Sequence, residues 1–528
     1  MRRRQALLLG SVLAGLTACA ALHALWTAPA LPRDAETVPR PPRIRPDYAS
    51  IIVPPNIAPL NFRVREPGRR FCVRIAGPVG KPVEVHSSAP ELVIPPAGWR
   101  RLLAANRGRR LALHVHAQDA SGRWRRFQPV HQTVAREPVD PVLVYRLIRP
   151  LYNAYTTVQV YQRDLTTYRE SLVVDGRAFR NGCVNCHTFL NHRPDTMLVH
   201  VRGKAGNAML LATDGRVSKV NTTTRYNRPP GAYSCWHPSG RFLTFSVNRL
   251  EQFFHAVGET RDVFDQASDL GCYAPAARAV TSCRHLTRPD RLETFPAWSP
   301  DGRTLYYSSA PKGTIDHYKT VRYDLLRIAY DPEAGTWGEP EVVLSAEETG
   351  VSLTEPRVSP DGRFLMFCAA PYGAFPVYQP GADLYVLDLR TGRHGKLPAP
   401  VNSDRCESWH CWSSNGRWFV FSSKRRDGIF ARPHFSYFSP EGKVGKPFVL
   451  PQRDPGFYDA LLKTYNVPEL VTGPIPLRPA DFTRAVLDSA GTVTAHAVSG
   501  ATRRPAGGAV GASNAVSPRR PETIPAAR

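Results

Sequence analysis

The chain has little acidic charge, and this shortage is the first notable feature of its composition. Its 528 residues include 44 Asp and Glu against 69 Lys and Arg, which gives a formal net charge of +25. Such an excess can indicate binding to nucleic acid or to another anionic partner. The basic residues are scattered along the chain, however, and no nucleic-acid-binding motif accompanies them. We therefore expect no nucleic-acid partner and attribute the charge to a generally arginine-rich composition.

Signatures of the common enzyme classes are also missing. The sequence has no convincing serine–histidine–acid combination, no paired catalytic carboxylates and no glycine-rich phosphate loop. It has a single C-x-x-C pair, without the second pair that would complete a zinc site. Hydrolytic, nucleotide-dependent and zinc-dependent chemistry are therefore poor explanations of this chain.

The beginning of the chain has the composition of an export signal. Arg2, Arg3 and Arg4 precede an apolar run that extends from Ala6 to about residue 30, an order typical of segments that direct a chain across a membrane. Within the run, Leu16-Thr17-Ala18-Cys19 resembles a bacterial lipobox, with Cys19 as the candidate lipidation site. The run is also long enough to remain as an uncleaved anchor. A cleaved signal, a lipoprotein and an anchor stay open, and each places the rest of the chain in the periplasm, membrane-associated in the last two.

Proline and glycine are plentiful, with 50 and 38 copies, which favours strands and turns over long helices. A proline-rich linker over 31–48 is followed by short alternating runs that predict a β-sandwich-like domain over 49–137. Residues 138–192 carry many tyrosines and are expected to contain a helix or two and a cysteine motif. Residues 471–528 are expected to be a low-complexity, disordered tail.

A repeat occupies the region between, residues 193–470. Each copy has a turn of the Pro-Asp-Gly type, in which proline fixes φ and glycine supplies a positive φ. An alternating run follows the turn and predicts a strand with one buried face. The four clear copies begin at Cys235, Ala297, Arg357 and Cys411, and a weaker one begins at Arg193. A repeat of this length built from strands predicts a β-propeller with five countable blades, and six are expected.

The sequence Cys183-Val184-Asn185-Cys186-His187 has the C-x-x-C-H spacing of a c-type haem attachment site. In such a site the two thiols form thioethers with the haem, and the histidine becomes the proximal ligand of the iron. Chance predicts roughly 0.006 such pentads in a chain of this composition. We therefore predict one covalent haem c, held by Cys183 and Cys186, with His187 bound to its iron. Because the motif stands between the predicted sandwich and the propeller, the haem is expected to lie between the two domains.

The sixth ligand of the iron stays open at this stage. Met197 and His200 lie just downstream on a predicted strand, where they would point to opposite faces, so at most one could reach the iron. His192 is a further candidate ligand, and the sixth position could also stay open. Methionine gives a higher potential than histidine, and an open position allows ligand binding or catalysis.

Other cysteines and histidines carry weaker predictions. Cys272 and Cys283 flank a short loop, where a disulfide would suit an oxidising compartment. Cys406 and Cys411 are another candidate pair. Several histidines fall at blade turns or loops, where they could line the propeller funnel but are expected to be structural hydrogen-bonding groups: His237, His255, His410 and His434.

The chain resembles a bacterial family of periplasmic proteins in which a haem c motif is fused to a TolB-like β-propeller. The resemblance spans roughly residues 50–470 and implies fold and cofactor, but little about activity. The stretches that carry it are Asp140–Ile148, Cys183–His187, Asp195–Gly203, Trp236–Gly240, Glu293–Gly302, Ser408–Arg425, Leu450–Pro455 and Tyr465–Leu470.

Three functions remain compatible with this combination. The first is electron transfer, in which a redox partner docks on the basic surface of the propeller. The second is a haem-dependent oxidoreductase with its active site at the propeller funnel, although no second cofactor site is identified. The third is a TolB-type scaffold, in which the propeller binds protein and the haem senses redox state or a gas. The redox partner itself cannot be named from the sequence.

Overall fold

The computed structural model describes residues 31–32, 34–148, 158–224, 231–253 and 262–498. The predicted export signal and Cys19 lie outside these residues, as does His255. Within the described residues, no helix is long and apolar enough to cross a membrane. The chain divides into two compact units, one made of residues 1–50, 59–134 and 452–459 and the other of residues 51–58, 135–451 and 460–528.

The first unit is built from strands and one helix. Its central strand β8 (Arg110–Gln118) pairs with β5 (Arg70–Ala76) on one side and with β9 (Trp124–Phe127) and β10 (Val130–Val134) on the other. Strand β8 alternates as the sequence predicts, because Leu111, Leu113, Val115 and Ala117 are buried. The remaining elements are β1 (Ala35–Val38) beside β9, β6 (Val83–Ser87) beside β5, and a small sheet of β2 (Ile44–Arg45), β4 (Phe62–Val64) and β7 (Glu91–Leu92).

Helix α2 (Pro96–Ala105) completes this unit. It begins with proline at its first turn, where the missing N–H leaves no hydrogen bond unmade. It buries Trp99, Leu102 and Leu103 on one side. Two sheets with buried apolar side chains agree with the β-sandwich-like fold expected for this region, and the helix was not anticipated.

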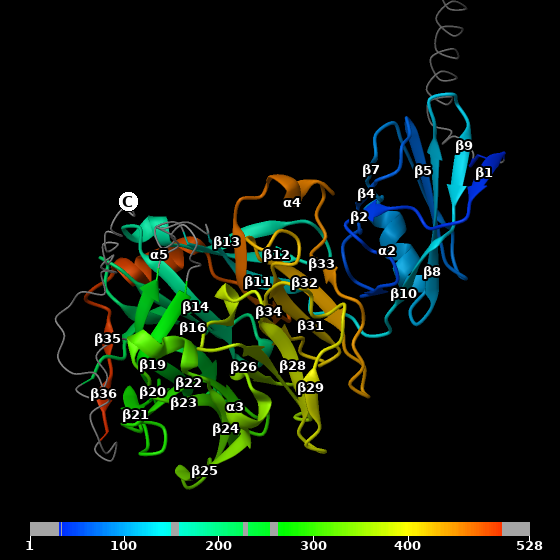
Figure 1. Cartoon of the computed structure of the whole chain (residues 1–528). Helices are drawn as coiled ribbons and strands as arrows, with labels where there is room; N and C mark the ends of the chain where they lie inside the picture. Colours follow the sequence, from blue (N-terminus) through cyan, green and yellow to red (C-terminus); the bar gives the residue numbers. More distant parts are fainter. Residues whose placement is uncertain (1–30, 33, 149–157, 225–230, 254–261, 499–528) are drawn as a thin grey trace, which may run out of the picture. The chain divides into compact units, whose positions relative to one another are not determined.

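The second unit is a β-propeller of six sheets, each with four blade strands (Figure 1). The innermost strands contact one another in sequence around a ring, and the last of them contacts the first. In order from the innermost strand outward, blade 1 consists of β14 (Cys183–Phe189), β15 (Met197–Arg202), β16 (Ala208–Thr213) and β17 (Arg216–Asn221). Blade 2 consists of β18 (Ala232–Trp236), β19 (Leu243–Phe253), β20 (Asp262–Ala274) and β21 (Ala279–Thr281). Blade 3 consists of β22 (Arg291–Trp298), β23 (Thr304–Pro311), β24 (Asp324–Asp331) and β25 (Thr336–Leu344). Blades 4 and 5 are β26 (Ser352–Val358), β27 (Phe364–Ala370), β28 (Asp383–Asp388), β29 (His394–Lys396); and β30 (Glu407–Trp412), β31 (Trp418–Ser423), β32 (Arg432–Tyr437), β33 (Phe448–Val449).

Blade 6 is assembled from both ends of the propeller sequence. Its three outer strands are β11 (Val142–Ile148), β12 (Gln159–Asp164) and β13 (Glu170–Asp175), and its innermost strand is β34 (Thr464–Val471). Figure 1 shows the orange β34 beside the much earlier β11, with which it pairs in antiparallel fashion. The described residues of the region that was expected to hold a helix or two, 138–148 and 158–170, contain strands and no helix. The tyrosine-rich segment forms β11 and β12, which pair with each other, and β11 also pairs with β34 more than 300 residues away.

The turn motif of the repeat adopts the expected geometry. In blade 3, the Gly302 N–H donates to the Ser299 carbonyl at 2.9 Å, and the Ser299 hydroxyl donates to Asp301 at 2.5 Å. The four repeat glycines have φ between 65° and 72°, the left-handed region that glycine enters without strain. Blade 5 has Asn415 in place of the aspartate, and its side-chain oxygen accepts from Ser413 at 2.6 Å in the same way.

Hydrophobic clusters fill the spaces between neighbouring blades. One of them joins Met366 and Cys368 of blade 4 to Trp412, Phe419 and Phe421 of blade 5. Similar clusters lie between blades 6 and 1 and between blades 1 and 2. Each repeat therefore buries its apolar side chains against the next one, as expected for a propeller.

The segment after β34 is folded further than the sequence predicts. Helix α5 (Pro479–Leu487) buries Phe482 and Val486, and β35 (Val493–Thr494) and β36 (His496–Ala497) pair in parallel with the outer strands of blades 1 and 2. The expectation of a disordered tail from residue 471 is therefore wrong for residues up to 498. The short helices not yet named are η2 (Gly176–Phe179), η3 (Leu190–His192), η4 (Ile315–Thr320), α3 (Ala346–Thr349), η5 (Pro376–Tyr378) and α4 (Phe457–Ala460), and the short strand β3 (Ile52–Val53) belongs to the second unit.

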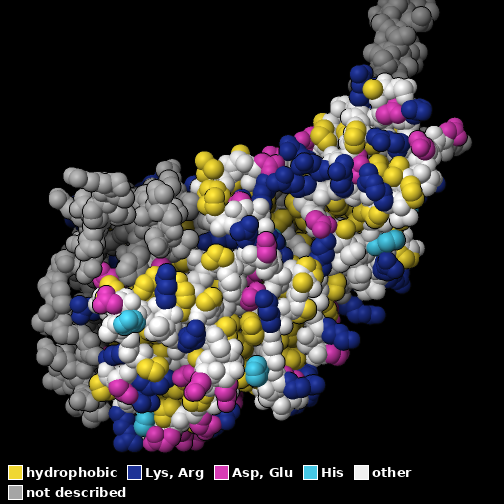
Figure 2. Space-filling model, viewed as in Figure 1, with side chains coloured by type: hydrophobic (Ala, Val, Ile, Leu, Met, Phe, Trp, Pro, Cys, Tyr) yellow, Lys and Arg dark blue, Asp and Glu magenta, His cyan; other side chains and the backbone are white. Residues whose placement is uncertain are grey.

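Basic side chains are dispersed over the propeller surface. On the face shown in Figure 2, Lys and Arg stand among Asp, Glu and neutral polar side chains. Several are paired with acidic neighbours, such as Arg327 with Glu341 at 2.6 Å and Arg363 with Asp388 at 3.0 Å. This distribution agrees with the interpretation of the charge as a general property of the composition.

Candidate functional site

The innermost strands of all six blades share one irregularity. In each, the pairing with the neighbouring strand shifts by one residue at the same place, which is the geometry of a β-bulge. In five blades the residue at this point has a positive φ although it is not glycine, and these residues are Tyr233, Phe295, Glu355, Trp409 and Val467. In blade 1 the equivalent position is Asn185 of the C-x-x-C-H motif, and Cys186 is the second residue of the bulge. Such bulges commonly re-aim side chains next to functional sites.

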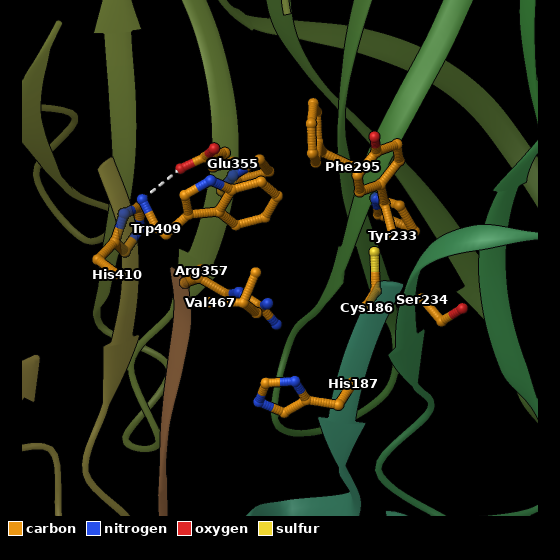
Figure 3. Close-up of a pocket in the computed structure, with 12 residues that line it drawn as sticks. Cys186, His187, Tyr233, Ser234, Phe295, Glu355, Arg357, Trp409, His410 and Val467 are labelled. Carbon is orange, nitrogen blue, oxygen red and sulfur yellow. Dashed lines mark hydrogen bonds between the residues drawn. The ribbon is translucent and has the colours of Figure 1, made fainter. Parts of the chain in front are cut away.

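The six bulges surround a small pocket at the centre of the propeller, with about 440 Å³ of space when the solvent at its open mouth is counted. The side chains in Figure 3 enter it from all six innermost strands. The cavity is lined by Cys186, His187, Tyr233, Ser234, Phe295, Pro296, Glu355, Pro356, Arg357, Trp409, His410 and Val467.

The C-x-x-C-H motif therefore lies inside the propeller. Cys183, Cys186 and His187 are all on β14, the innermost strand of blade 1, and are 9%, 5% and 1% exposed. The expectation that the motif lies between two domains is wrong, because the segment before the motif supplies strands of blade 6 instead of a separate linker.

The bulge changes the relation between the two cysteines. On a regular strand, side chains three residues apart point to opposite faces. The register shift between Val184 and His187 inserts one extra residue, so Cys183 and Cys186 come to the same face of the sheet. Two thiols on one face are the arrangement that a doubly attached group requires.

His187 has the chemistry of a metal ligand. Among the residues that the structure describes, neither of its ring nitrogens makes a hydrogen bond of standard geometry. Burial lowers the pKa of His187 to about 3, and the positive charges of Arg146 and Arg357 act in the same direction, against an interaction with the Val144 backbone, so the imidazole is neutral. The neutral imidazole is the form that binds iron. A buried polar group without a well-aligned hydrogen bond is costly, and coordination would remove that cost.

The Cys186 thiol is also protonated in this environment. Burial raises the pKa of Cys186, and Figure 3 shows its sulfur directed toward Tyr233. Cys183 lies outside the cavity lining, and its sulfur accepts from Arg202 Nη2 at 3.9 Å. The donor set of two thiols on one face and a neutral imidazole beside a cavity fits a covalently attached haem.

The candidates for a sixth ligand are not brought to the cavity. Met197 is fully buried in the hydrophobic cluster between blades 6 and 1, together with Val199 and Val201. His200 is buried beside Asn185, with 3.4 Å between His200 Nδ1 and Asn185 Nδ2. The ring of His192 contacts the carbonyl oxygen of Leu470 at 2.9 Å. In the described part of the chain, no group of three or more His, Cys, Asp and Glu side chains is arranged to hold a metal ion.

Two acidic residues and an arginine of the site were missed by sequence analysis. Glu355 accepts from the Trp409 N–H at 2.7 Å through Oε2, while its Oε1 has no hydrogen-bond partner in the described structure. Burial raises the pKa of Glu355 to about 8. Arg357 projects into the cavity (Figure 3) and lies 3.5 Å from Glu469, whose pKa is raised to about 7 by burial. The repeat contained a usable signal, because the bulge residue stands two positions before the start of each repeat copy.

Of the described histidines considered for the funnel, one lines the cavity and two do not. His410 lines the cavity and bonds to the Met366 carbonyl oxygen at 3.0 Å. His237 stacks on Phe242 and bonds to the Gly302 carbonyl oxygen at 3.0 Å, and His434 bonds to the Arg432 carbonyl oxygen at 3.0 Å. These contacts make His237 and His434 structural.

The cysteines considered for disulfides are free thiols in the structure. Cys272 and Cys283 are both unbridged, and the sulfur of Cys272 lies 3.3 Å from the Thr244 hydroxyl. Cys406 and Cys411 are unbridged as well, and each contacts a backbone carbonyl oxygen. Neither predicted pair is joined in the structure.

Comparison with known proteins gives matches only at the level of solved structures. No protein-family model matches the chain, and no curated protein matches it by sequence. TolB from Acinetobacter baumannii is 15% identical, with 68% of this chain and 79% of that chain covered and a TM-score of 0.40. A putative TolB from Agrobacterium tumefaciens is 14% identical, with 59% and 88% covered and a TM-score of 0.35. An oligogalacturonate lyase from Vibrio parahaemolyticus is 12% identical, with 57% and 92% covered and a TM-score of 0.32. The assignment of a six-bladed propeller is carried by the ring of sheets described above.

Proposed function

We propose that this protein is an exported c-type haem protein that carries its haem at the central cavity of the propeller. Cys183 and Cys186 would hold the haem, and His187 would bind its iron. The observation that carries the proposal is His187, a buried neutral imidazole on the innermost strand beside a cavity, whose nitrogens make no hydrogen bond of standard geometry within the described structure. The export signal predicted from the sequence supports a periplasmic location, with the N-terminus as the membrane attachment.

Electron transfer is the function that this arrangement supports best. Haem c supplies one-electron redox chemistry when bound. The chain's contribution is a site fixed on strands, with the proximal imidazole held neutral by burial and by nearby arginines. Tyr233 and Trp409 are only partly buried at the cavity, and they provide a route to the surface at which a redox partner could dock.

A second candidate is a haem-dependent oxidoreductase with its active site in the cavity. The observation that favours it is Glu355, whose free carboxyl oxygen has no partner in the part of the chain that the structure describes. At neutral pH the raised pKa keeps this carboxyl group protonated, so it could donate a proton to a molecule bound in the cavity.

Haem staining of the denatured protein tests the attachment. The chain should be produced with export and haem maturation, alongside a variant with Cys183→Ala and Cys186→Ala and a control with Cys283→Ala. Wild type and control should retain covalent haem, and the double variant should lose all of it. Haem staining that survives in the double variant would contradict the proposal, and a wild type without haem would leave the binding-scaffold function in its place.

Spectroscopy of the loaded protein separates the two redox functions. A six-coordinate spectrum without carbon monoxide binding would favour electron transfer, whereas rapid binding of carbon monoxide or peroxide would favour the oxidoreductase. A His187→Gly variant should lose its proximal-ligand spectrum, and added imidazole should restore it. Failure of imidazole to restore the spectrum would contradict the assignment of His187 as the iron ligand.

A further inference from the structure

The central cavity contains a positive charge that its carboxylates balance only in part. The Arg357 side chain is 29% exposed, and Figure 3 shows it extending into the cavity from the side opposite β14. In the described structure its ion-pair partner is Glu469, at a single distance of 3.5 Å. This is long for a charge-assisted hydrogen bond, for which about 2.7–2.9 Å is usual. Much of the guanidinium's hydrogen-bonding capacity is therefore turned toward the cavity.

A second arginine lies behind the haem motif and is held by neutral groups. Arg146 donates to the side-chain oxygen of Asn185 at 2.8 Å and to that of Asn466, and it reaches the Val184 carbonyl oxygen at 3.4 Å. Among the described residues, no carboxylate forms an ion pair with Arg146. Asn185 lies between Cys183 and Cys186, so this positive charge is fixed directly at the motif.

The acidic residues nearby do not cancel the two arginines at neutral pH. Burial raises the pKa of Glu355 to about 8, which leaves it protonated, and raises that of Glu469 to about 7. The arginines in turn lower the pKa of His187. An organic cation would be repelled from such a cavity, whereas an anionic oxygen would be attracted and could accept hydrogen bonds from the guanidinium.

We infer that Arg357 binds an anionic oxygen of a molecule in the central cavity, in the electrostatic field that it shares with Arg146. This inference deepens the proposed function, and it rests on that function where the haem supplies the anion. A carboxylate of the haem itself is the first source, and a small free oxyanion has the same chemistry and is the second. Arg357 is thus a binding residue of the cavity.

The experiment uses variants matched for charge. Because Arg357→Gln alone would leave Glu469 buried without its partner, the variant R357Q/E469Q is compared with E469Q. Arg327→Gln, which removes an exposed arginine paired with Glu341, is the control for a change of net charge outside the cavity. Arg357→Lys tests whether charge alone is sufficient.

If the haem supplies the anion, R357Q/E469Q should shift the reduction equilibrium of the loaded protein about tenfold toward the oxidised form relative to E469Q, which corresponds to about 59 mV. R357K, which keeps the positive charge, should have a reduction potential close to that of the wild type, and R327Q should show no shift. The loaded wild type should not bind inorganic phosphate in calorimetry. If a free anion is the source, phosphate should bind the wild type at least tenfold more tightly than R357Q/E469Q.

An unchanged reduction potential, together with no Arg357-dependent phosphate binding, would overturn the inference. The titration is repeated on the chain with Cys183→Ala and Cys186→Ala, which carries no attached haem. If the wild type itself proves to lack haem, the proposed function fails while this phosphate titration still decides the inference. Arg357-dependent phosphate binding there would support it, and no binding would overturn it.

Discussion

The innermost strand of blade 1 and the innermost strands of blades 2 to 5 have the same backbone geometry but different side chains. All carry the bulge at the same register. In blades 2 to 5 the bulge residue is followed closely by the repeat that builds the blade, whereas β14 has the C-x-x-C-H motif at this place and only a degenerate repeat after it. The comparison teaches that the repeat supplies stability around the ring, whereas β14 carries the residues of the proposed haem site in its place. Substitutions in the two kinds of strand should therefore affect different measurements.

The largest stability effect is expected from the core of a regular blade. Trp418 is fully buried on β31, packs against Tyr437 with 5.2 Å between ring centroids, and donates to the Glu137 carbonyl oxygen at 3.0 Å. Trp418→Ala should reduce the free energy of unfolding by about 4 kcal/mol, because it creates a large cavity and leaves that carbonyl unpaired. Urea unfolding measures the effect. Covalent haem should remain on the folded fraction. Its loss would show that the blade core and the proposed haem site are not independent.

Glu355 should make stability depend on pH in a way that Glu355→Gln removes. Its pKa is raised from 4.5 to about 8, so the folded state holds a proton that the unfolded state releases. Stability from this group is therefore present below about pH 4.5 and is lost as the pH rises toward about 8. Between pH 5 and 8 the wild type should lose about 3 kcal/mol more than E355Q. Chemical unfolding of both proteins at several pH values tests this, and parallel pH curves would contradict it.

The repeat turns should tolerate substitution unequally. Gly416→Ala places a non-glycine residue at φ 65°, and its new methyl group would meet Pro360 at an ordinary 3.5 Å, so a cost of about 1–2 kcal/mol is expected. Gly302→Ala adds a clash at 2.5 Å with the His237 ring and should cost more. Thermal unfolding of the two variants side by side measures the difference. Equal losses would show that the neighbouring blade adjusts without cost.

The smallest effect is expected from giving the fourth repeat copy the aspartate of the second and third copies. Asn415→Asp keeps a side-chain oxygen that can accept from the Ser413 hydroxyl and the Arg417 N–H, as Asn415 does at 2.6 Å and 3.0 Å. It removes the amide that donates to the exposed Pro138 carbonyl oxygen at 2.8 Å. The free energy of unfolding should therefore fall by about 0.5–1 kcal/mol. An unchanged value in the same unfolding assay would mean that the bond to Pro138 contributes nothing to stability.

The regular blades could be predicted from sequence because their information is local. A Pro-Asp-Gly turn and the alternating strand after it lie within about twelve residues, as at Ala297, so the pattern is visible without knowing any distant contact. Blade 6 has no such signature. Its strands β11 and β34 become a pair only when the ring closes, and no local periodicity reveals a partner at that separation.

The candidate site was predictable in part for the same reason. Cys183, Cys186 and His187 form a local motif, and their chemistry could be anticipated from spacing alone. Their place inside the propeller could not be anticipated, since it depends on the segment before the motif forming strands of blade 6. Glu355, Arg357 and Trp409 reach the same cavity from other blades, and only the register of the repeat, traced two residues back from each copy, would have brought them together.

The closure of the ring also sets an order of events during folding. Strand β11 is available early in synthesis, but its inner edge stays unpaired until residues 464–471 have been made. An open strand edge is a template for pairing with another chain, and the entropy of closing so long a loop delays the native pairing. A chain that stops before β34 would therefore keep an exposed edge and an unclosed cavity. Only a chain that has been made as far as β34 can close the ring and cover the edge of β11.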